Sequence, residues 1–261
     1  MTPFSGGGRL RAFHLSFTQN RLLMILLAML LPVLVGLNIL SALQFNGRYH
    51  LPWTLADQLC QTTLPPVFLF IVAVPFVYLV CHEIKYGFSA PVILRYPNKS
   101  ALWRHQTAQI AVSALLVSLY LYLSVLSVGK TLGLGTINWD SAVSAYYART
   151  QTFNTQDSLL TVSLLFILSS FIGLLSSGVI LLWFRWITGR FLPGFICLLT
   201  IGAMDIVGIP LLYSRLGLEH RRWLRTQQLG GDLLLCLLVT VMLIAAGSIY
   251  ARRKDFLHEQ Q

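Results

Sequence analysis

Six apolar runs determine what this chain can fold into. They reach or approach membrane-spanning length at residues 22–43, 64–81, 110–128, 159–184, 191–213 and 233–250. Roughly 20 residues of helix cross the hydrocarbon core of a bilayer, so each run has about the length of one crossing. The runs account for most of the 261 residues. The sequence therefore predicts an all-α integral membrane protein with six transmembrane helices in one transmembrane domain, residues 1–261.

The composition excludes an ordinary soluble enzyme or a disulfide-stapled domain. Of the residues, 56% are hydrophobic and 11% are charged, whereas a soluble domain carries about 25% charged residues. The four cysteines, Cys60, Cys81, Cys197 and Cys236, have no CxxC spacing, and the histidines are scattered. We therefore expect no disulfide framework, no metal site and no cofactor in this chain.

The distribution of basic residues predicts the orientation. With six crossings both termini lie on one side, and the segments on that side carry 12 of the 19 lysines and arginines. Cytoplasmic loops are enriched in these residues, so both termini are expected in the cytoplasm. A basic cluster at 215–225 falls on the opposite side and weakens this bias.

The first 20 residues predict a surface helix. Leu10, Phe13 and Phe17 recur at helical spacing, and Arg9 and Arg11 lie beside them. This pattern is typical of an amphipathic helix at the membrane surface before the first span. A disordered basic tail is the alternative.

The polar segment between the second and third runs, "CHEIKYGFSAPVILRYPNKSALWRHQ", predicts two short helices. Ser89 caps the first, Pro97 forces a turn, and Asn98 caps a second helix that continues into the third span. Trp103 and Arg104 are typical of an anchor at the headgroup level. The alternative is an ordinary basic loop with interfacial anchors.

Three features together resemble the permease subunits of ABC-2 type transporters. They are the six spans after a surface helix, the segment with Glu83 and Gly87 at the end of the second span, and the ending "IYARRKDF". The resemblance covers the whole chain as topology, but only the last two stretches carry it at the level of residues. The long basic segment at 215–225 departs from it, because many relatives place short re-entrant helices there.

This resemblance implies a coupling helix after the second span that docks on an ATP-binding subunit. The coupling residues would be Glu83, Gly87, Ser89, Val92, Ile93, Leu94 and Arg95. It implies a bacterial cytoplasmic-membrane exporter of a peptide, antibiotic or lipid-like substrate. The partners would be a cytoplasmic ATPase dimer, which binds the ATP, a second permease copy or a homologous permease, and membrane lipids. Neither enzymatic activity nor nucleic-acid binding is expected of this chain.

A second interpretation is a non-transporting immunity or sensor protein that binds a peptide outside the cell. The predicted external segments carry Trp139, Tyr146, Tyr147 and Trp223, which would form such a binding surface. The connection at 129–157 is rich in Gly, Ser, Thr and Tyr and is expected to form a small ordered cap.

Asp205 is the one carboxylate well inside an apolar run. A carboxylate in lipid is costly and normally faces water or a partner. Gly208 and Pro210 follow, so the helix is expected to break there. Asp205, Gly208 and Pro210 therefore mark a possible translocation path or outer gate. The alternative is a carboxylate near the interface, paired with an arginine such as Arg215.

Two motifs are incomplete. "VGKT" at 128–131 lacks the first glycine of a phosphate-binding loop, because Ser124 stands there. "HEIKY" at 82–86 has Tyr86 where a zinc protease has its second histidine. Neither motif predicts an active site.

Overall fold

The structure is a computed structural model that describes residues 21–87, 96 and 98–253. Every regular element within these residues is a helix, which confirms the predicted all-α class. The surface helix before residue 21 and the first short helix of the coupling segment lie outside the described residues. The longer helices are α2 (Arg21–Gly47), α5 (Val74–Gly87), α7 (Lys99–Thr131), α9 (Leu159–Thr188), α10 (Leu192–Val207) and α12 (Thr226–Arg253).

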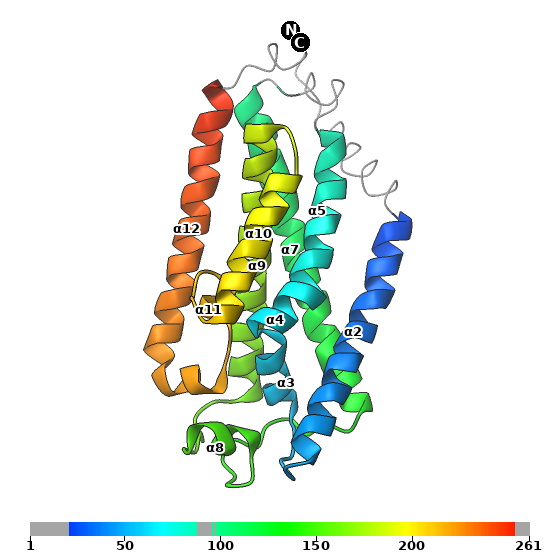
Figure 1. Ribbon diagram of the computed structural model, residues 1–261, viewed down its shortest axis with the longest axis vertical. Coiled ribbons are helices and arrows are strands. Elements are labelled where there is room, and N and C mark those ends of the chain that lie inside the picture. The colour runs from blue at the N-terminus through cyan, green and yellow to red at the C-terminus, as the bar shows by residue number, and fades with distance from the viewer. Residues whose placement is uncertain (1–20, 88–95, 97, 254–261) are drawn as a thin grey trace.

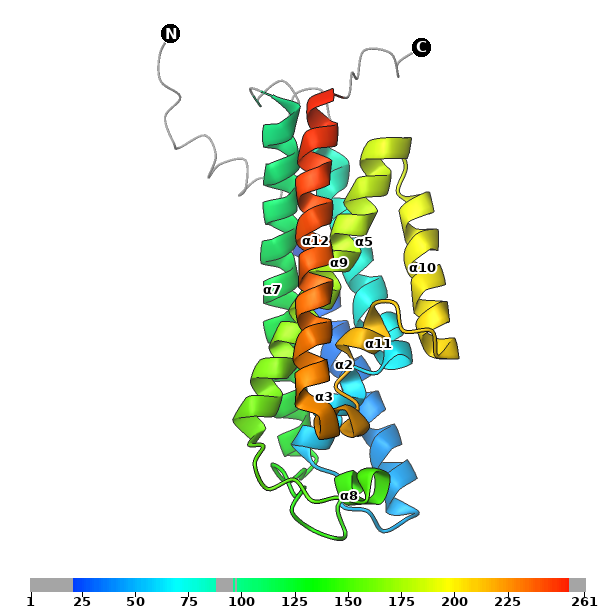
Figure 2. The same ribbon diagram turned by 90° about the vertical axis from the view of Figure 1, so that its left-hand side faces the viewer.

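Short helices complete the bundle. They are α3 (Leu55–Thr62), α4 (Pro65–Val67), the π-helical η1 (Phe68–Ala73), α8 (Ala145–Thr150), α11 (Tyr213–Leu216) and the 3₁₀-helical η2 (His220–Arg225). The end of α5, the start of α7, the α9–α10 turn and the end of α12 lie at one end of the bundle, which we call the terminal end (Figure 1). α3 and α8 lie toward the opposite end, which we call the far end (Figures 1 and 2).

Within the described residues, five helical segments are long and apolar enough to cross a membrane. They are Met29–Gly47, Pro65–Lys85, Lys99–Thr131, Leu159–Thr188 and Gln227–Arg253. The second of them joins α4, η1 and α5 into one rod. The chain thus has the helices of a multi-pass membrane protein.

The predicted crossing at 191–213 is not a continuous helix of that length. α10 has 16 residues and ends at Val207, which corresponds to roughly 24 Å of helix. Gly208 follows with φ of 98°, a left-handed conformation that ends the helix. The predicted break is therefore confirmed. It ends α10 at Val207, and α10 does not continue through the predicted run to residue 213.

Local signals set the other boundaries. The Asn98 side chain accepts a hydrogen bond from the Ala101 amide at 2.7 Å, so it caps α7 as predicted. α7 then runs without interruption into the third apolar run. Gly189 in the left-handed conformation ends α9, and α10 begins at Leu192, so a short turn joins the two helices.

α9 is the central helix of the bundle. It packs against α3, α5, α7, α10, α11 and α12. Its sequence "SSFIGLLSSG" offers small residues, which allow helices to approach closely in a membrane. A Cβ added at Gly178 would come within 2.4 Å of Ile110 on α7. Close packing around α9 therefore fixes the positions of the other helices.

Candidate functional site

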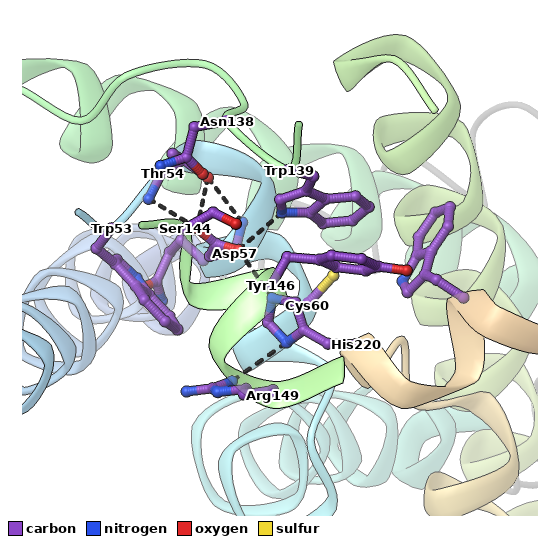
Figure 3. A network of polar contacts seen from close by, with 12 residues as sticks. Trp53, Thr54, Asp57, Cys60, Asn138, Trp139, Ser144, Tyr146, Arg149 and His220 are labelled. Atoms are coloured by element: carbon purple, nitrogen blue, oxygen red, sulfur yellow. Dashed lines mark hydrogen bonds and ion pairs between the residues drawn. The ribbon is translucent and has the colours of Figure 1, made fainter. Parts of the chain in front are cut away.

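A buried carboxylate organises the far end of the bundle. Asp57 on α3 is fully buried and accepts four hydrogen bonds (Figure 3). Its Oδ2 accepts from the Thr54 amide at 3.0 Å and the Thr54 hydroxyl at 2.6 Å. Its Oδ1 accepts from Trp139 Nε1 and from His220 Nε2, both at 2.8 Å. One side chain thereby joins α3, the 132–158 connection and η2.

The local sequence explains how Asp57 is held. Thr54 is the N-cap of α3 and Asp57 is its third helical residue, so the two form a reciprocal capping box. Sequence reasoning missed this site, although the Thr-x-x-Asp spacing was a visible signal. Trp139 and His220 lie 82 and 163 residues away, and no local pattern predicts that they meet Asp57.

The hydrogen bonds of His220 indicate which ring nitrogen donates and which accepts. Arg149 Nη1 lies 3.2 Å from His220 Nδ1. A guanidinium only donates, so Nδ1 accepts and the ring proton is on Nε2, which donates to Asp57. The imidazole thus lies between a carboxylate and a guanidinium. Burial acts to raise the pKa of Asp57, but hydrogen bonds from His220, Thr54 and Trp139 hold that pKa below its usual 3.8.

Aromatic rings enclose this network. Trp139 stacks on Tyr146 with centroids 4.7 Å apart and meets Trp223 edge-on at 5.2 Å. The predicted peptide-binding surface includes Tyr147, which is half-buried and stacks on Phe153. Trp139, Tyr146 and Trp223 are 1%, 1% and 4% exposed, so these three do not form that surface. They form a core because their polar atoms have partners inside the protein. The predicted ordered cap at 129–157 is confirmed: it carries α8 and this aromatic core.

A polar cavity of about 510 Å³ adjoins the network. The residues that line it are Cys60, Gln61, Leu64, Ala148, Arg149, Glu219, His220 and Arg221. Burial and the nearby charge of Asp57 raise the pKa of the Cys60 thiol well above its usual value. The thiol therefore stays protonated and is a poor nucleophile, so the chemistry of this site favours binding over covalent catalysis.

The basic cluster at 215–225 divides into two groups. Arg215 and Arg222 both bind Asp232 on α12. Arg222 also donates to the carbonyls of Ser214, Arg215 and Gly217, which ties the α11–η2 turn to α12. Arg221 and Arg225 are exposed.

At the terminal end, Trp103 locks the start of α7 to two other helices. It is fully buried, and its Nε1 donates to the Ile244 carbonyl on α12 at 3.0 Å. Its ring meets Trp183 and Trp186 of α9 edge-on at 5.8 and 5.7 Å. The prediction that Trp103 is a headgroup anchor is therefore wrong, because α9 and α12 enclose the ring. We call Trp103, Trp183, Trp186 and Gly247 the tryptophan root.

The predicted coupling residues fall partly inside the described chain. Glu83 lies on α5, and both carboxylate oxygens are 3.1 Å from the Ser113 hydroxyl of α7. Gly87 is the last residue of α5. Ser89 and Val92 to Arg95 lie outside the described residues. The structure thus turns Glu83 toward α7, and the coupling role of the whole set stays a prediction.

The predicted gate residues form a compact turn. Asp205 is 3% exposed and its carboxylate accepts from the backbone amides of Leu211, Leu212 and Tyr213 at 2.7, 3.2 and 2.7 Å. Arg215 binds Asp232 and the Pro210 carbonyl, so the alternative pairing of Asp205 with Arg215 is wrong. Asp205 instead holds the turn between α10 and α11.

Replacing Asp205 with asparagine tests the gate prediction against this structural role. The carboxamide has one acceptor oxygen, so at least one amide would face an NH₂ group. We expect a loss of about 1–3 kcal/mol in the free energy of unfolding, measured by denaturation in mild detergent. Reduced export at unchanged stability would instead support a direct role on the translocation path.

No protein-family model matches the chain, and no curated protein or solved structure matches it either. The described residues define a class of protein: they are all-helical, and five of their helices can cross a membrane by length and composition.

Proposed function

We propose that the chain is the membrane-spanning permease subunit of an ABC-2 type exporter. It would lie in the bacterial cytoplasmic membrane as six crossings, with α10 as the short fifth one and both termini in the cytoplasm. A separate ATPase dimer would bind and hydrolyse ATP. A second permease copy or a homologous permease would complete the pathway for a peptide, antibiotic or lipid-like substrate.

The tryptophan root is the observation that carries this proposal. The proposed coupling segment leads directly into α7, and Trp103 lies at the fifth residue of that helix. Close-packed interiors transmit displacement because they do not deform continuously. A push on the segment before α7 would therefore reach α9 and α12 through Trp103.

The length of α7 supports the same interpretation. Its 33 residues correspond to roughly 50 Å, whereas the hydrocarbon core is about 30 Å thick. About four turns therefore extend beyond the hydrocarbon. Such an extension has the reach that a lever at the membrane surface requires.

The region between α10 and α12 also supports the proposal. The basic segment at 215–225 looked like a departure from the family pattern in sequence. It contains η2 and the end of α11, in the place where many ABC-2 permeases have short re-entrant helices. The presence of short helices in this region makes it more similar to the family pattern than the basic sequence alone suggests.

The proposal is tested by purifying tagged protein from its native cell in mild detergent and identifying what co-purifies. We expect a near-stoichiometric soluble ATPase. A variant with Val92, Ile93, Leu94 and Arg95 all changed to glutamate should lose it, while the control Arg225→Glu at the far end should retain it. A folded preparation without any ATPase would contradict the permease proposal.

The second candidate function is a non-transporting immunity or sensor protein with an external ligand. The polar cavity at the far end favours it, because a sensor needs a binding site but no ATPase. Binding of a ligand there by a protein that captures no ATPase would be the result expected for this alternative.

A further inference from the structure

The cavity at the far end is formed where three distant segments meet. The end of α3 supplies Cys60, Gln61 and Leu64, α8 supplies Ala148 and Arg149, and the start of η2 supplies His220 with its neighbours Glu219 and Arg221. Its volume of about 510 Å³ is within the range of small-ligand sites, about 300–1,000 Å³. Its lining is mainly polar, which is unusual in so apolar a chain.

Arg149 is positioned before any ligand arrives. Its Nη1 contacts His220 Nδ1, and its guanidinium lies over the Trp53 ring, 5.2 Å from the centroid. Asp57 holds the imidazole from the other side at 2.8 Å. The guanidinium is thus fixed in direction, which reduces the entropy lost when it binds a partner.

Arg149 has no carboxylate within ion-pair distance in the described part of the chain. Two other arginines at this end, Arg215 and Arg222, share Asp232. The contrast matters because a half-buried cation without a carboxylate in direct contact attracts an anion. Within the described residues, the donors of Arg149 other than Nη1 remain for a ligand.

The charges on the cavity wall select a singly charged ligand group. Arg149 and Arg221 contribute two positive charges and Glu219 contributes one negative charge. A planar carboxylate matches the two parallel donors of a guanidinium. The net charge of the wall is thus +1, which one carboxylate neutralises.

We propose that this cavity binds the carboxylate group of a ligand, with Arg149 as the principal contact and Arg221 and Gln61 beside it. The ligand is either a small soluble carboxylate or the carboxyl terminus of a peptide. The site is predicted to face the outside of the cell. The proposal does not depend on an ATPase partner. Either the carboxylate proposal or the permease proposal can therefore fail while the other stands.

The test is isothermal titration calorimetry of the purified full chain in detergent. The probes are acetate, the tripeptide Ala-Ala-Ala and its carboxyl-terminal amide. We expect the free tripeptide to bind and the amide to bind at least about tenfold more weakly, because the amide removes the anion. Acetate that competes with the tripeptide would indicate a small carboxylate as the sufficient ligand; binding of the tripeptide alone would indicate a peptide terminus.

Matched variants locate the site. Arg149→Gln and the exposed Arg221→Gln should each weaken binding by about tenfold. Arg149→Lys should also weaken binding, because lysine lacks the two parallel donors of a guanidinium. Arg225→Gln lies outside the cavity and should leave binding unchanged. Arg221→Gln is exposed, so it reports on binding even where Arg149→Gln fails to fold.

Three outcomes would overturn the proposal. They are no binding of acetate or tripeptide by the folded protein, equal binding of the tripeptide and its amide, and an equal loss in Arg225→Gln. Binding of inorganic phosphate without any carboxylate binding would overturn the assignment to a carboxylate.

Discussion

Replacing Asp57 with alanine is expected to lower the free energy of unfolding by about 3–5 kcal/mol. The carboxylate is fully buried and accepts hydrogen bonds from Thr54, Trp139 and His220. Alanine would leave these donors without an acceptor, in a site from which aromatic rings exclude water. An unsatisfied buried donor is costly. Urea or thermal denaturation of the purified protein in mild detergent would measure the loss.

The same residue predicts a dependence on pH. Asp57 has a pKa below 3.8 in the folded protein. Its contribution to stability is therefore complete above the unfolded pKa of about 4 and is lost as the pH falls through the folded pKa. The stability difference between the parent protein and Asp57→Asn should be largest near neutral pH and shrink below about pH 4.

Both Asp57 variants have a matched control at the same end of the bundle. Glu219→Gln alters an exposed carboxylate and should change stability by less than about 0.5 kcal/mol. A parent protein and an Asp57→Ala variant of equal stability would show that the network does not hold the far end together.

Replacing Gly247 with alanine is expected to destabilise the tryptophan root by about 1–3 kcal/mol. A Cβ at this position would lie 1.9 Å from Cζ2 of Trp103 and 2.4 Å from two further ring atoms. An indole ring cannot bend away, so α12 or the start of α7 must move. Denaturation in mild detergent would measure the change.

Gly231 provides the control on the same helix. A Cβ there meets nothing within 4 Å, so Gly231→Ala should be neutral or stabilising through helix propensity. Trp103→Leu makes room for a Cβ at position 247. Gly247→Ala should therefore lower the free energy of unfolding less in the Trp103→Leu background than in the parent protein. Equal losses from Gly247→Ala and Gly231→Ala would mean that Trp103 and Gly247 are not packed as described.

The two clusters differ in how far the sequence could have revealed them. The Thr54–Asp57 capping box was visible as a local spacing, and the Asn98 cap was predicted correctly for the same reason. The tryptophan root was not visible in the sequence. Between Trp103 and Trp186 the chain runs the length of the bundle along α7 and returns along α9. A tryptophan next to Arg104 in a basic segment is also typical of an interfacial anchor, so local sequence favoured the wrong interpretation.

The gate residues show the same division. Gly208 and Pro210 predicted the end of a helix correctly, because backbone conformation is a local property. The partners of Asp205 were predicted wrongly. A carboxylate can be satisfied by an arginine or by backbone amides, and only the turn into α11 determines which of them lies within reach.

By itself the sequence determined the all-helical class, the long apolar helices, the break after Val207 and the cap of α7. These follow from hydropathy over about 20 residues and from the conformations of single Asn, Gly and Pro residues. The tertiary structure alone decided that Asp57, Arg149 and His220 form one network, that Arg215 and Arg222 share Asp232, and that Trp103 lies in the core. Such contacts depend on how helices pack around α9, and packing between segments far apart in the chain leaves no periodic signal in the sequence.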